Sequence, residues 1–267
     1  MKSALEARRQ TFRKKKGDGH FFVKKRNEKS VRHLFYRISR RVGDAIGAYS
    51  MIEDGDRIVV AISGGKDSMA LLDMLRYRQR FAPVKYELLA VWIDMDIPGF
   101  PRAELTAFMK KADVPFMVEK GDSVQGGRWE DVNCYHCAQL RRKLLFQLAD
   151  RQGFNKIALG HHLDDLAETI LLNMFYRAEI GAMCPKQEMF GGRITIIRPL
   201  AFVHEQEIEE LVRQGKAVSF EGHACPNDQR SKRGLFREII QRLEQENPGV
   251  KKNILRSLSN IRKDYLL

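Results

Sequence analysis

Hydrophobic residues recur at spacings of three and four between residues 31 and 49, which places them on one face of a helix. This set is Val31, Leu34, Phe35, Ile38, Val42, Ile46 and Tyr49. The pattern predicts an amphipathic helix over residues 31–52. The residues before it show no such periodicity, and we expect a flexible arm over residues 1–30.

From Arg57 onward, short apolar runs alternate with longer helical patterns. The predicted strands cover residues 57–63, 86–94, 115–120 and 156–160, and the predicted helices cover 67–80, about 103 onward, 135–152 and 163–177. The runs IVVAI and LLAVWI are apolar at successive positions, as expected for parallel strands that are covered by helices on both faces. The alternation predicts a Rossmann-like, doubly wound α/β sheet with its functional residues at the carboxyl ends of the strands.

The last third of the chain completes this domain. The segment GGRITIIRPL, which ends at Leu200, is predicted to be a later pair of strands, and helices are predicted near residues 204–215 and 231–246. No apolar run reaches the roughly 18 residues that a membrane-spanning helix needs, so we expect no membrane segment. We expect an α/β domain over residues 53–228 and a basic helical segment over 229–267.

Positive charge is concentrated at the two ends of the chain. The sequence has 47 Lys and Arg against 34 Asp and Glu, a formal net charge of +13. Residues 1–41 hold 15 basic and 3 acidic side chains, residues 42–228 hold 22 and 27, and residues 229–267 hold 10 and 4. Aromatic residues such as Phe12 and Phe21 lie among the basic residues of the arm, which suits a polyanion such as RNA. A solvated arm without a partner explains the charge equally well.

The chain has four cysteines, and their use depends on whether the protein is in a reducing or an oxidising compartment. No secretory signal precedes them, because the basic N-terminus has no apolar stretch behind it. We therefore expect a reducing, cytoplasmic location, where paired cysteines bind metals or do redox chemistry more often than they form structural disulfides.

The segment SGGKDS stands at the end of the first predicted strand and opens a helix. Gly64 and Gly65 let the backbone approach an anion, the following helix offers N–H groups at its positive end, and Lys66 adds charge. Ser63 and Ser68 can donate hydrogen bonds to phosphate oxygens, and Asp67 can cap the helix or hold a metal-bound water. The segment lacks the Walker pattern, but it predicts a phosphate site more strongly than a simple tight turn.

A second block, GHHLDDLAET, follows the strand that ends near Gly160. Asp164 and Asp165 can hold Mg²⁺ or orient a base, and His161 can contact a phosphate or a base. Alternatively, both carboxylates serve only as helix N-terminal charges.

The pair Cys134 and Cys137, in the segment CYHC, can chelate one metal centre. Cys225 is a third ligand only if the fold brings it back to the pair. Zinc with a histidine or Cys184 as fourth ligand, a redox disulfide, and an iron-sulfur cluster remain open from the spacing, and zinc is the commonest of the three.

The segment SGGKDS resembles the pyrophosphate loop of the N-type ATP pyrophosphatases, and GHHLDD resembles a block of their tRNA-modifying branch. The order of this loop, CYHC, GHHLDD, IRPL (residues 197–200) and Cys225 closely resembles the tRNA 2-thiocytidine synthetases, the TtcA-type sulfurtransferases. The resemblance runs from about Val31 to the C-terminus. The uridine-thiolating relatives have extra zinc-binding CxxC pairs, which four cysteines cannot supply, so the cytidine branch is favoured.

The resemblance implies a 4Fe-4S cluster on Cys134, Cys137 and Cys225, and ATP with Mg²⁺. It also implies that ATP binds with its phosphates on residues 63–68 and near Gly160 and His161, with its adenosine near Ala61 and Asp94. The base oxygen would attack the α-phosphorus, while Lys66, Arg141 and Mg²⁺ balance the developing charge and Asp164 and Asp165 hold the metal or the base.

The resemblance further implies tRNA as substrate, modified at cytidine 32, and a sulfur donor that is either a cysteine desulfurase or free sulfide. The sequence leaves open a homodimer, the role of Cys184, and three other functions. These are tRNA 2-thiouridine synthesis, another RNA-adenylating reaction such as that of a lysidine synthetase, and RNA binding without catalysis.

Overall fold

The computed structural model describes residues 28–111, 114–121, 134–217, 219–220, 233–262 and 264. Its strands are β1 (Arg57–Ile62), β2 (Glu87–Asp94), β3 (Phe116–Lys120), β4 (Lys156–Ala158), β5 (Lys186–Met189) and β6 (Ile194–Ile197). Its helices are α2 (Lys29–Ala48), α3 (Lys66–Arg78), α4 (Arg102–Lys111), α5 (Cys134–Gln152), α6 (Leu163–Arg177), α7 (Glu205–Gly215), α8 (Arg233–Glu246) and α9 (Val250–Ser257).

The strands form one sheet in the order β3-β2-β1-β4-β6-β5. All neighbouring strands run parallel except β5, which is antiparallel to β6 at the edge. The chain moves outward from β1 in both directions, so the predicted doubly wound α/β sheet is confirmed. β1 and β4 are neighbours, and their carboxyl ends therefore lie side by side at one edge of the sheet.

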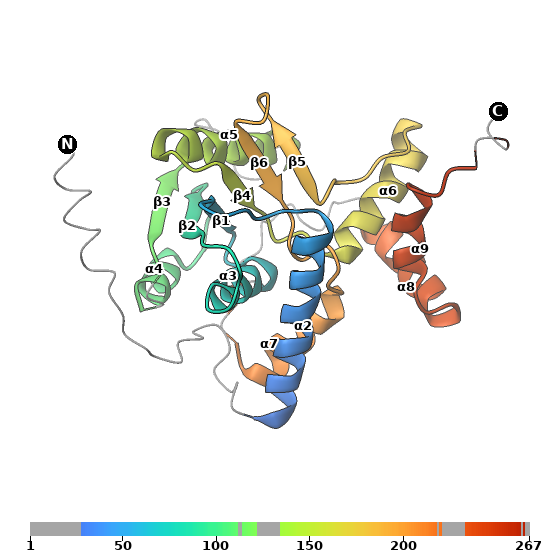
Figure 1. Cartoon of the computed structure of the whole chain (residues 1–267), viewed down its shortest axis with the longest axis horizontal. Coiled ribbons are helices and arrows are strands. Elements are labelled where there is room, and N and C mark those ends of the chain that lie inside the picture. Colours follow the sequence, from blue (N-terminus) through green and yellow to red (C-terminus); the bar gives the residue numbers. More distant parts are fainter. Residues whose placement is uncertain are drawn as a thin grey trace.

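Helices cover both faces of the sheet (Figure 1). α5 packs on one face, where its Leu148 and Ala149 join a core cluster with Val59 of β1. The other core cluster lies around α3, which contacts β1, α2 and α7, and it includes Phe35 and Leu71. Burial of such apolar side chains on both faces is the main stabilising contribution to the fold.

α8 and α9 form a separate group with α6, to one side of the sheet (Figure 1). α9 lies within the predicted basic helical segment over residues 229–267, but it was not predicted as a separate helix, because its sequence VKKNILRS has few apolar residues and follows Pro248 and Gly249 closely. The remaining predicted helices are present, with ends that differ by one or two residues.

Two predicted boundaries were wrong. The edge hairpin joins β5 to β6, so the first strand of the pair lies before GGRITIIRPL, and Gly191 and Gly192, with φ of +66° and +86°, form the turn. The N-terminal helix begins at Lys29 and ends at Ala48 rather than at residue 52, because Ser50 adopts a left-handed φ of +46°. Tyr49 consequently lies past the helix end and is 39% exposed rather than buried.

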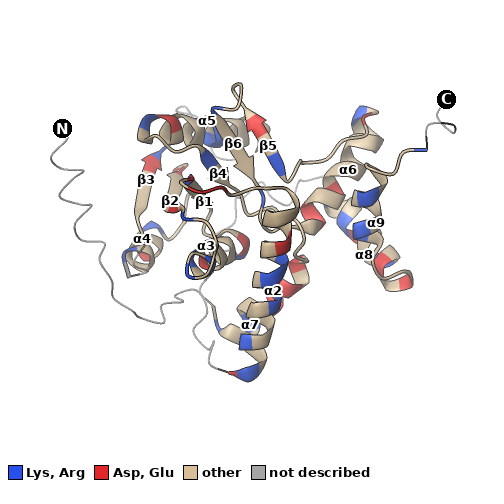
Figure 2. Cartoon of the chain, in the orientation of Figure 1, with Lys and Arg blue, Asp and Glu red and all other residues tan. Residues whose placement is uncertain are grey.

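Basic side chains are spread along α2 and α9, whereas α8 carries both signs (Figure 2). Residues 1–27, to which most of the predicted arm belongs, lie outside the described residues. No helix in the described part of the chain is long and apolar enough to cross a membrane.

Candidate nucleotide and metal site

Three chain segments meet at the carboxyl edge of the sheet: SGGKDS after β1, GHHLDD after β4, and the loop after β6. The first two are in direct contact. A Cβ atom added to Gly160 would lie only 3.1 Å from the backbone nitrogen of Ser68, which is closer than nearly all Cβ contacts in proteins. Glycine at position 160 therefore brings the two predicted blocks together, as their positions at neighbouring strand ends require.

Hydrogen bonds of its own serines fix the conformation of the phosphate loop. Ser68 is 5% exposed, accepts a hydrogen bond from the backbone N–H of Ser63 at 3.1 Å and donates one to the carbonyl of Gly65 at 3.0 Å. Gly64 has a φ of +89°, which favours glycine, and a Cβ atom there would lie 2.9 Å from the ring of Phe100. The loop ends at the N-terminus of α3, and the positive end of the helix dipole attracts anions there.

Lys66 lies at the first position of α3 and forms two ion pairs. Its Nζ is 3.1 Å from Oε1 of Glu205 and 3.5 Å from Oδ2 of Asp67. The predicted role of Asp67 as helix cap was wrong, because Gly65 occupies the N-cap position and makes no side-chain cap. Glu205, the first residue of α7, was missed by the sequence analysis because it lies 139 residues from Lys66.

The carboxylates of GHHLDD have different partners. His162 is the N-cap of α6, and Asp165 completes a capping box with it, so Asp165 does serve as a helix N-terminal charge. Asp165 also lies 3.6 Å from the guanidinium of Arg233. Whether it holds Mg²⁺ as well stays a prediction.

Asp164 is buried and faces away from solvent. Its Oδ1 lies 2.5 Å from Nζ of Lys251 in α9, and its Oδ2 accepts a hydrogen bond from the backbone N–H of Glu205 at 2.8 Å. Burial alone would raise the pKa of Asp164, but these two contacts outweigh it and hold the pKa below its usual value. Asp164 thus ties α9 and the start of α7 to the beginning of α6.

His161 is paired with Arg198, the arginine of the IRPL segment. Nε of Arg198 donates to Nδ1 of His161 at 3.2 Å, and its Nη1 donates to the carbonyl of Cys184. Burial lowers the pKa of His161 to about 4 and that of Arg198 to about 10. At neutral pH the imidazole is therefore uncharged, and Arg198 remains a cation beside it. Arg198 was not among the predicted site residues.

Asp94 and Ala61, the predicted neighbours of the adenosine, lie on adjacent strands. Asp94 ends β2, and its two carboxylate oxygens accept a bifurcated hydrogen bond from the Nε–H of Arg102, at 3.1 and 3.2 Å. Ala61 is half-buried on β1 and pairs in register with Val91. Because β1 and β2 are parallel neighbours, both residues lie near the edge of the sheet from which the phosphate loop leaves β1.

The predicted metal ligands are only partly described. Cys134 and Cys137 fall within the first turn of α5, and Cys137 is a free, buried thiol that is 8% exposed. The side chain of Cys134 and the whole of Cys225 lie outside the described residues. Among the described residues, no three His, Cys, Asp or Glu side chains are grouped as a metal site. Arg141 lies two turns along α5 and is exposed.

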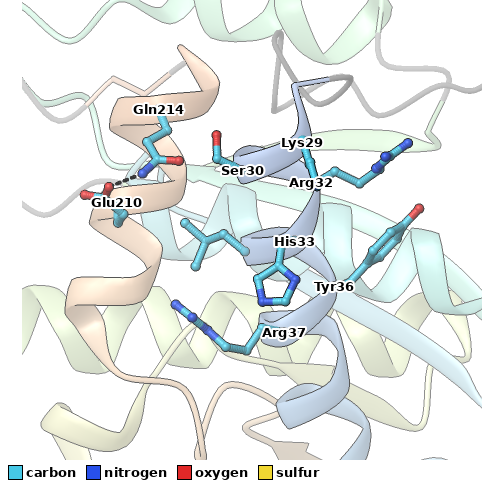
Figure 3. Close-up of a pocket in the computed structure, with 9 residues that line it drawn as sticks. Lys29, Ser30, Arg32, His33, Tyr36, Arg37, Glu210 and Gln214 are labelled. Atoms are coloured by element: carbon cyan, nitrogen blue, oxygen red, sulfur yellow. Dashed lines mark hydrogen bonds between the residues drawn. The ribbon is translucent and has the colours of Figure 1, made fainter.

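A large open cavity of about 950 Å³ lies away from this edge, between α2 and α7 (Figure 3). Arg37 extends toward α7, whereas Arg32 and Tyr36 project away from it, and Gln214 bonds to Glu210 on the α7 side. Arg37 and Arg41 are both paired with Glu207, so these cations fix α2 against α7. The cavity does not adjoin the phosphate loop.

Comparison with known proteins gives consistent matches. The family model described as a PP-loop domain matches residues 34–243. The tRNA-cytidine(32) 2-sulfurtransferase of Geotalea uraniireducens (strain Rf4) is 41% identical over 242 residues, which cover 88% of this chain and 95% of the relative. The enzyme of the same name from Janthinobacterium sp. (strain Marseille) is 39% identical over 253 residues, covering 91% and 79%.

A solved structure has the same fold. The U34-tRNA thiolase NcsA from Methanococcus maripaludis, determined with its 4Fe-4S cluster, superposes with a TM-score of 0.71 at 21% identity, covering 86% of this chain and 79% of that one. At this identity the likeness shows the fold alone.

Proposed function

Because the chain belongs to the PP-loop family of tRNA-cytidine(32) 2-sulfurtransferases, we propose that it uses ATP to replace the C2 oxygen of a tRNA cytidine with sulfur. The observation that carries the proposal is the contact between the phosphate loop and the GHHLDD block at Gly160. The base oxygen attacks the α-phosphorus of ATP and pyrophosphate leaves. A sulfur nucleophile then attacks C2, and AMP leaves with the former base oxygen.

The phosphate loop fits ATP in both shape and charge. The positive φ of Gly64 and the N-terminus of α3 turn backbone N–H groups toward an anion, and Ser63 and Ser68 already shape the loop through their hydroxyls. To bind the β- and γ-phosphates, the Lys66 side chain would move away from Glu205, with which it forms an ion pair in the structure. The adenosine would lie over the ends of β1 and β2, near Ala61 and Asp94.

Charge on the reacting phosphate would be balanced by Lys66, by Arg141 of α5 and by Mg²⁺. Since Lys251 already neutralises Asp164, we assign the metal contact to Asp165, together with the phosphate oxygens. Asp164 then acts by holding the ends of α6, α7 and α9 in place. Neutral His161 can donate a hydrogen bond through Nε2, because its Nδ1 accepts from Arg198.

The cysteines fit an iron-sulfur cluster by their chemistry. Thiolates are the usual ligands of such clusters, and Cys134 and Cys137 have the CxxC spacing with which two cysteines chelate one metal centre. We propose Cys225 as the third ligand. When bound, a 4Fe-4S cluster with three protein ligands supplies an iron that can hold sulfide in nucleophilic form.

We further propose cytidine 32 as the modified base and a cytoplasmic location. The sulfur would come from a cysteine desulfurase or from free sulfide, and the chain would act as a homodimer. The basic ends of the chain would bind the tRNA backbone.

The deciding experiment is nucleoside mass spectrometry of tRNA from a strain that lacks the protein. Loss of 2-thiocytidine, restored by the intact gene, is expected. Loss of 2-thiouridine would instead assign tRNA 2-thiouridine synthesis to the chain, and loss of lysidine would make it a lysidine synthetase. After anaerobic reconstitution, full thiolation and an intact cluster in a Cys225→Ala variant would refute the ligand assignment.

A further inference from the structure

A second cavity lies between the C-terminal half of α2, the loop after β6, the start of α6 and α9. Its volume is about 410 Å³, which is within the range of small-molecule sites. The lining residues are Arg41, Asp44, Tyr49, Leu163, Phe202, Lys252, Leu255 and Arg256. None of them belongs to the phosphate loop, to the CYHC segment or to the predicted adenosine site.

The basic side of the cavity is built by α9. Lys252 and Arg256 are four residues apart and therefore share one helix face. Both are exposed, and neither side chain forms an ion pair or hydrogen bond within the part of the chain that the structure describes. The neighbouring Lys251 is 3% exposed and pairs with Asp164, so the buried ion pair fixes the rotation of α9 and turns Lys252 and Arg256 toward the cavity.

The opposite side of the cavity is aromatic. The rings of Tyr49 and Phe202 lie 5.8 Å apart at an interplanar angle of 58°. Tyr49 is 39% exposed although it continues the apolar pattern of α2, because the helix ends at Ala48. Asp44 is the one carboxylate among the lining residues, against three basic side chains, and Arg41 is held at the rim by Glu207.

We propose that this cavity binds one nucleotide of the RNA substrate, with its phosphate on Lys252 and Arg256 and its base against Tyr49 and Phe202. Aromatic rings bind unstacked bases of any sequence, and pairs of cations bind the backbone phosphate. The proposal rests on the proposed function, because that function supplies the RNA.

Charge and position favour RNA over a protein partner. The positive charge of the cavity comes from α9, which lines it with Lys252 and Arg256, whereas the lining residues Arg41 and Asp44 of α2 carry opposite charges. α9 has three basic residues and no acidic one, as its colouring shows (Figure 2). Leu163 lines the cavity and directly precedes Asp164 and Asp165. A nucleotide held here would therefore fix the RNA beside the GHHLDD block without occupying the ATP site.

The test measures tRNA affinity at several salt concentrations for four variants. Lys252→Ala with Arg256→Ala should weaken binding about 10- to 100-fold and reduce the slope of log affinity against log salt by about 1.4, because two single-strand phosphate contacts are lost. Tyr49→Ala should weaken binding about 5- to 100-fold at unchanged slope, whereas Tyr49→Phe should keep wild-type affinity. Arg242→Ala, which removes an exposed cation from α8, is the control and should change binding less than threefold.

Measurements of ATP affinity and of thermal unfolding distinguish the loss of an RNA subsite from a general defect in folding. ATP affinity and the thermal unfolding midpoint should stay within error of wild type in all variants. The proposal is overturned if the double variant and Tyr49→Ala bind tRNA like wild type, or if Tyr49→Ala instead dissociates a dimer, which would make the cavity an interface between copies. If wild-type protein itself neither binds nor thiolates tRNA, the proposed function fails, and this outcome is distinct from failure of the subsite.

Discussion

At the scale of single residues, His161 shows how burial determines the charge of the site. Its imidazole has a pKa of about 4, whereas a histidine in the unfolded chain has a pKa near 6.5. The unfolded state therefore binds a proton below pH 6.5 that the folded state does not bind until pH 4. The contribution of His161 to the free energy of unfolding is fully present above pH 6.5, and it is lost as the pH falls from 6.5 to 4.

We predict that His161→Gln reduces the pH dependence of unfolding. Between pH 7.5 and pH 5, the free energy of unfolding of the wild type should fall by about 2 kcal/mol more than that of the variant. Urea titrations at the two pH values measure this difference. His33→Gln, at an exposed position of α2, is the matched control and should leave the pH dependence unchanged. Equal pH dependence of His161→Gln and wild type would contradict the assignment.

Gly160 is the residue on which the contact between the two motif blocks depends. A methyl group at this position would meet backbone atoms of Asp67 and Ser68 at 3.1 to 3.3 Å, which cannot move aside like a flexible side chain. We predict that Gly160→Ala displaces the phosphate loop and weakens ATP binding about tenfold or more. Isothermal titration with ATP gives the comparison. Gly47→Ala in α2 has no atom within 4 Å and should leave ATP affinity unchanged.

Local motifs predicted the glycines, serines and histidines of the site, because their chemistry depends on neighbours in sequence. They did not predict Glu205, Arg198 or Lys251. These residues are paired with partners that lie 139, 37 and 87 positions away, respectively. A charged residue, whether on a helix like Glu205 and Lys251 or after a strand like Arg198, has no sequence feature that distinguishes such a pair from a solvated surface charge, and only the fold selects between them.

At the scale of elements, α9 depends on a buried ion pair. The side chains of Lys251 and Asp164 are 4% and 9% exposed, and removal of either charge leaves the other buried without its partner. We predict that Lys251→Met or Asp164→Asn lowers the free energy of unfolding by about 3 to 5 kcal/mol. Chemical denaturation measures the loss, and the double variant should lose less than the sum of the single variants.

A control on α9 separates the effect of the buried ion pair from the effect of removing any positive charge. Lys252→Met removes the neighbouring exposed cation and should change stability by less than about 0.5 kcal/mol. If Lys251→Met were as mild as Lys252→Met, the ion pair would not hold the helix in place.

Element prediction succeeded where hydrophobic periodicity was strong. β1 and β2 were evident because buried parallel strands are apolar on both faces, and α2 because its apolar residues repeat every three to four positions. β5 was missed because KQEM lies at the antiparallel edge of the sheet and has partly exposed side chains. Tyr49 was assigned to the buried face because periodicity alone does not reveal that the helix stops one residue earlier.

At the scale of the whole molecule, the structure shows that the basic residues of the C-terminal tail are not all available to a polyanion. The tail over residues 229–267 carries 10 basic against 4 acidic residues, yet Arg237 pairs with Glu168 and Lys251 with Asp164. Part of the tail's charge therefore neutralises buried carboxylates near the phosphate loop. The cations available to a polyanion on the described surface include Arg32 and Arg40 of α2 and Lys252 and Arg256 of α9.

The remaining positive charge lies in residues 1–27, which hold ten Lys and Arg against two acidic residues. We predict that deletion of these residues, which leaves α2 intact from Lys29, weakens tRNA binding at least tenfold and lowers its salt dependence, because fewer counterions are released on binding. ATP affinity should be unchanged, since the ATP site is built from residues after Arg57. A chain with residues 1–27 in scrambled order keeps the charge and should bind tRNA nearly as tightly as wild type, whereas a chain with the ten basic residues replaced by serine should behave like the deletion. Filter-binding titrations between 50 and 200 mM salt compare the four proteins. If the scrambled chain bound as weakly as the deletion, the arm would act through a specific structure rather than through its charge.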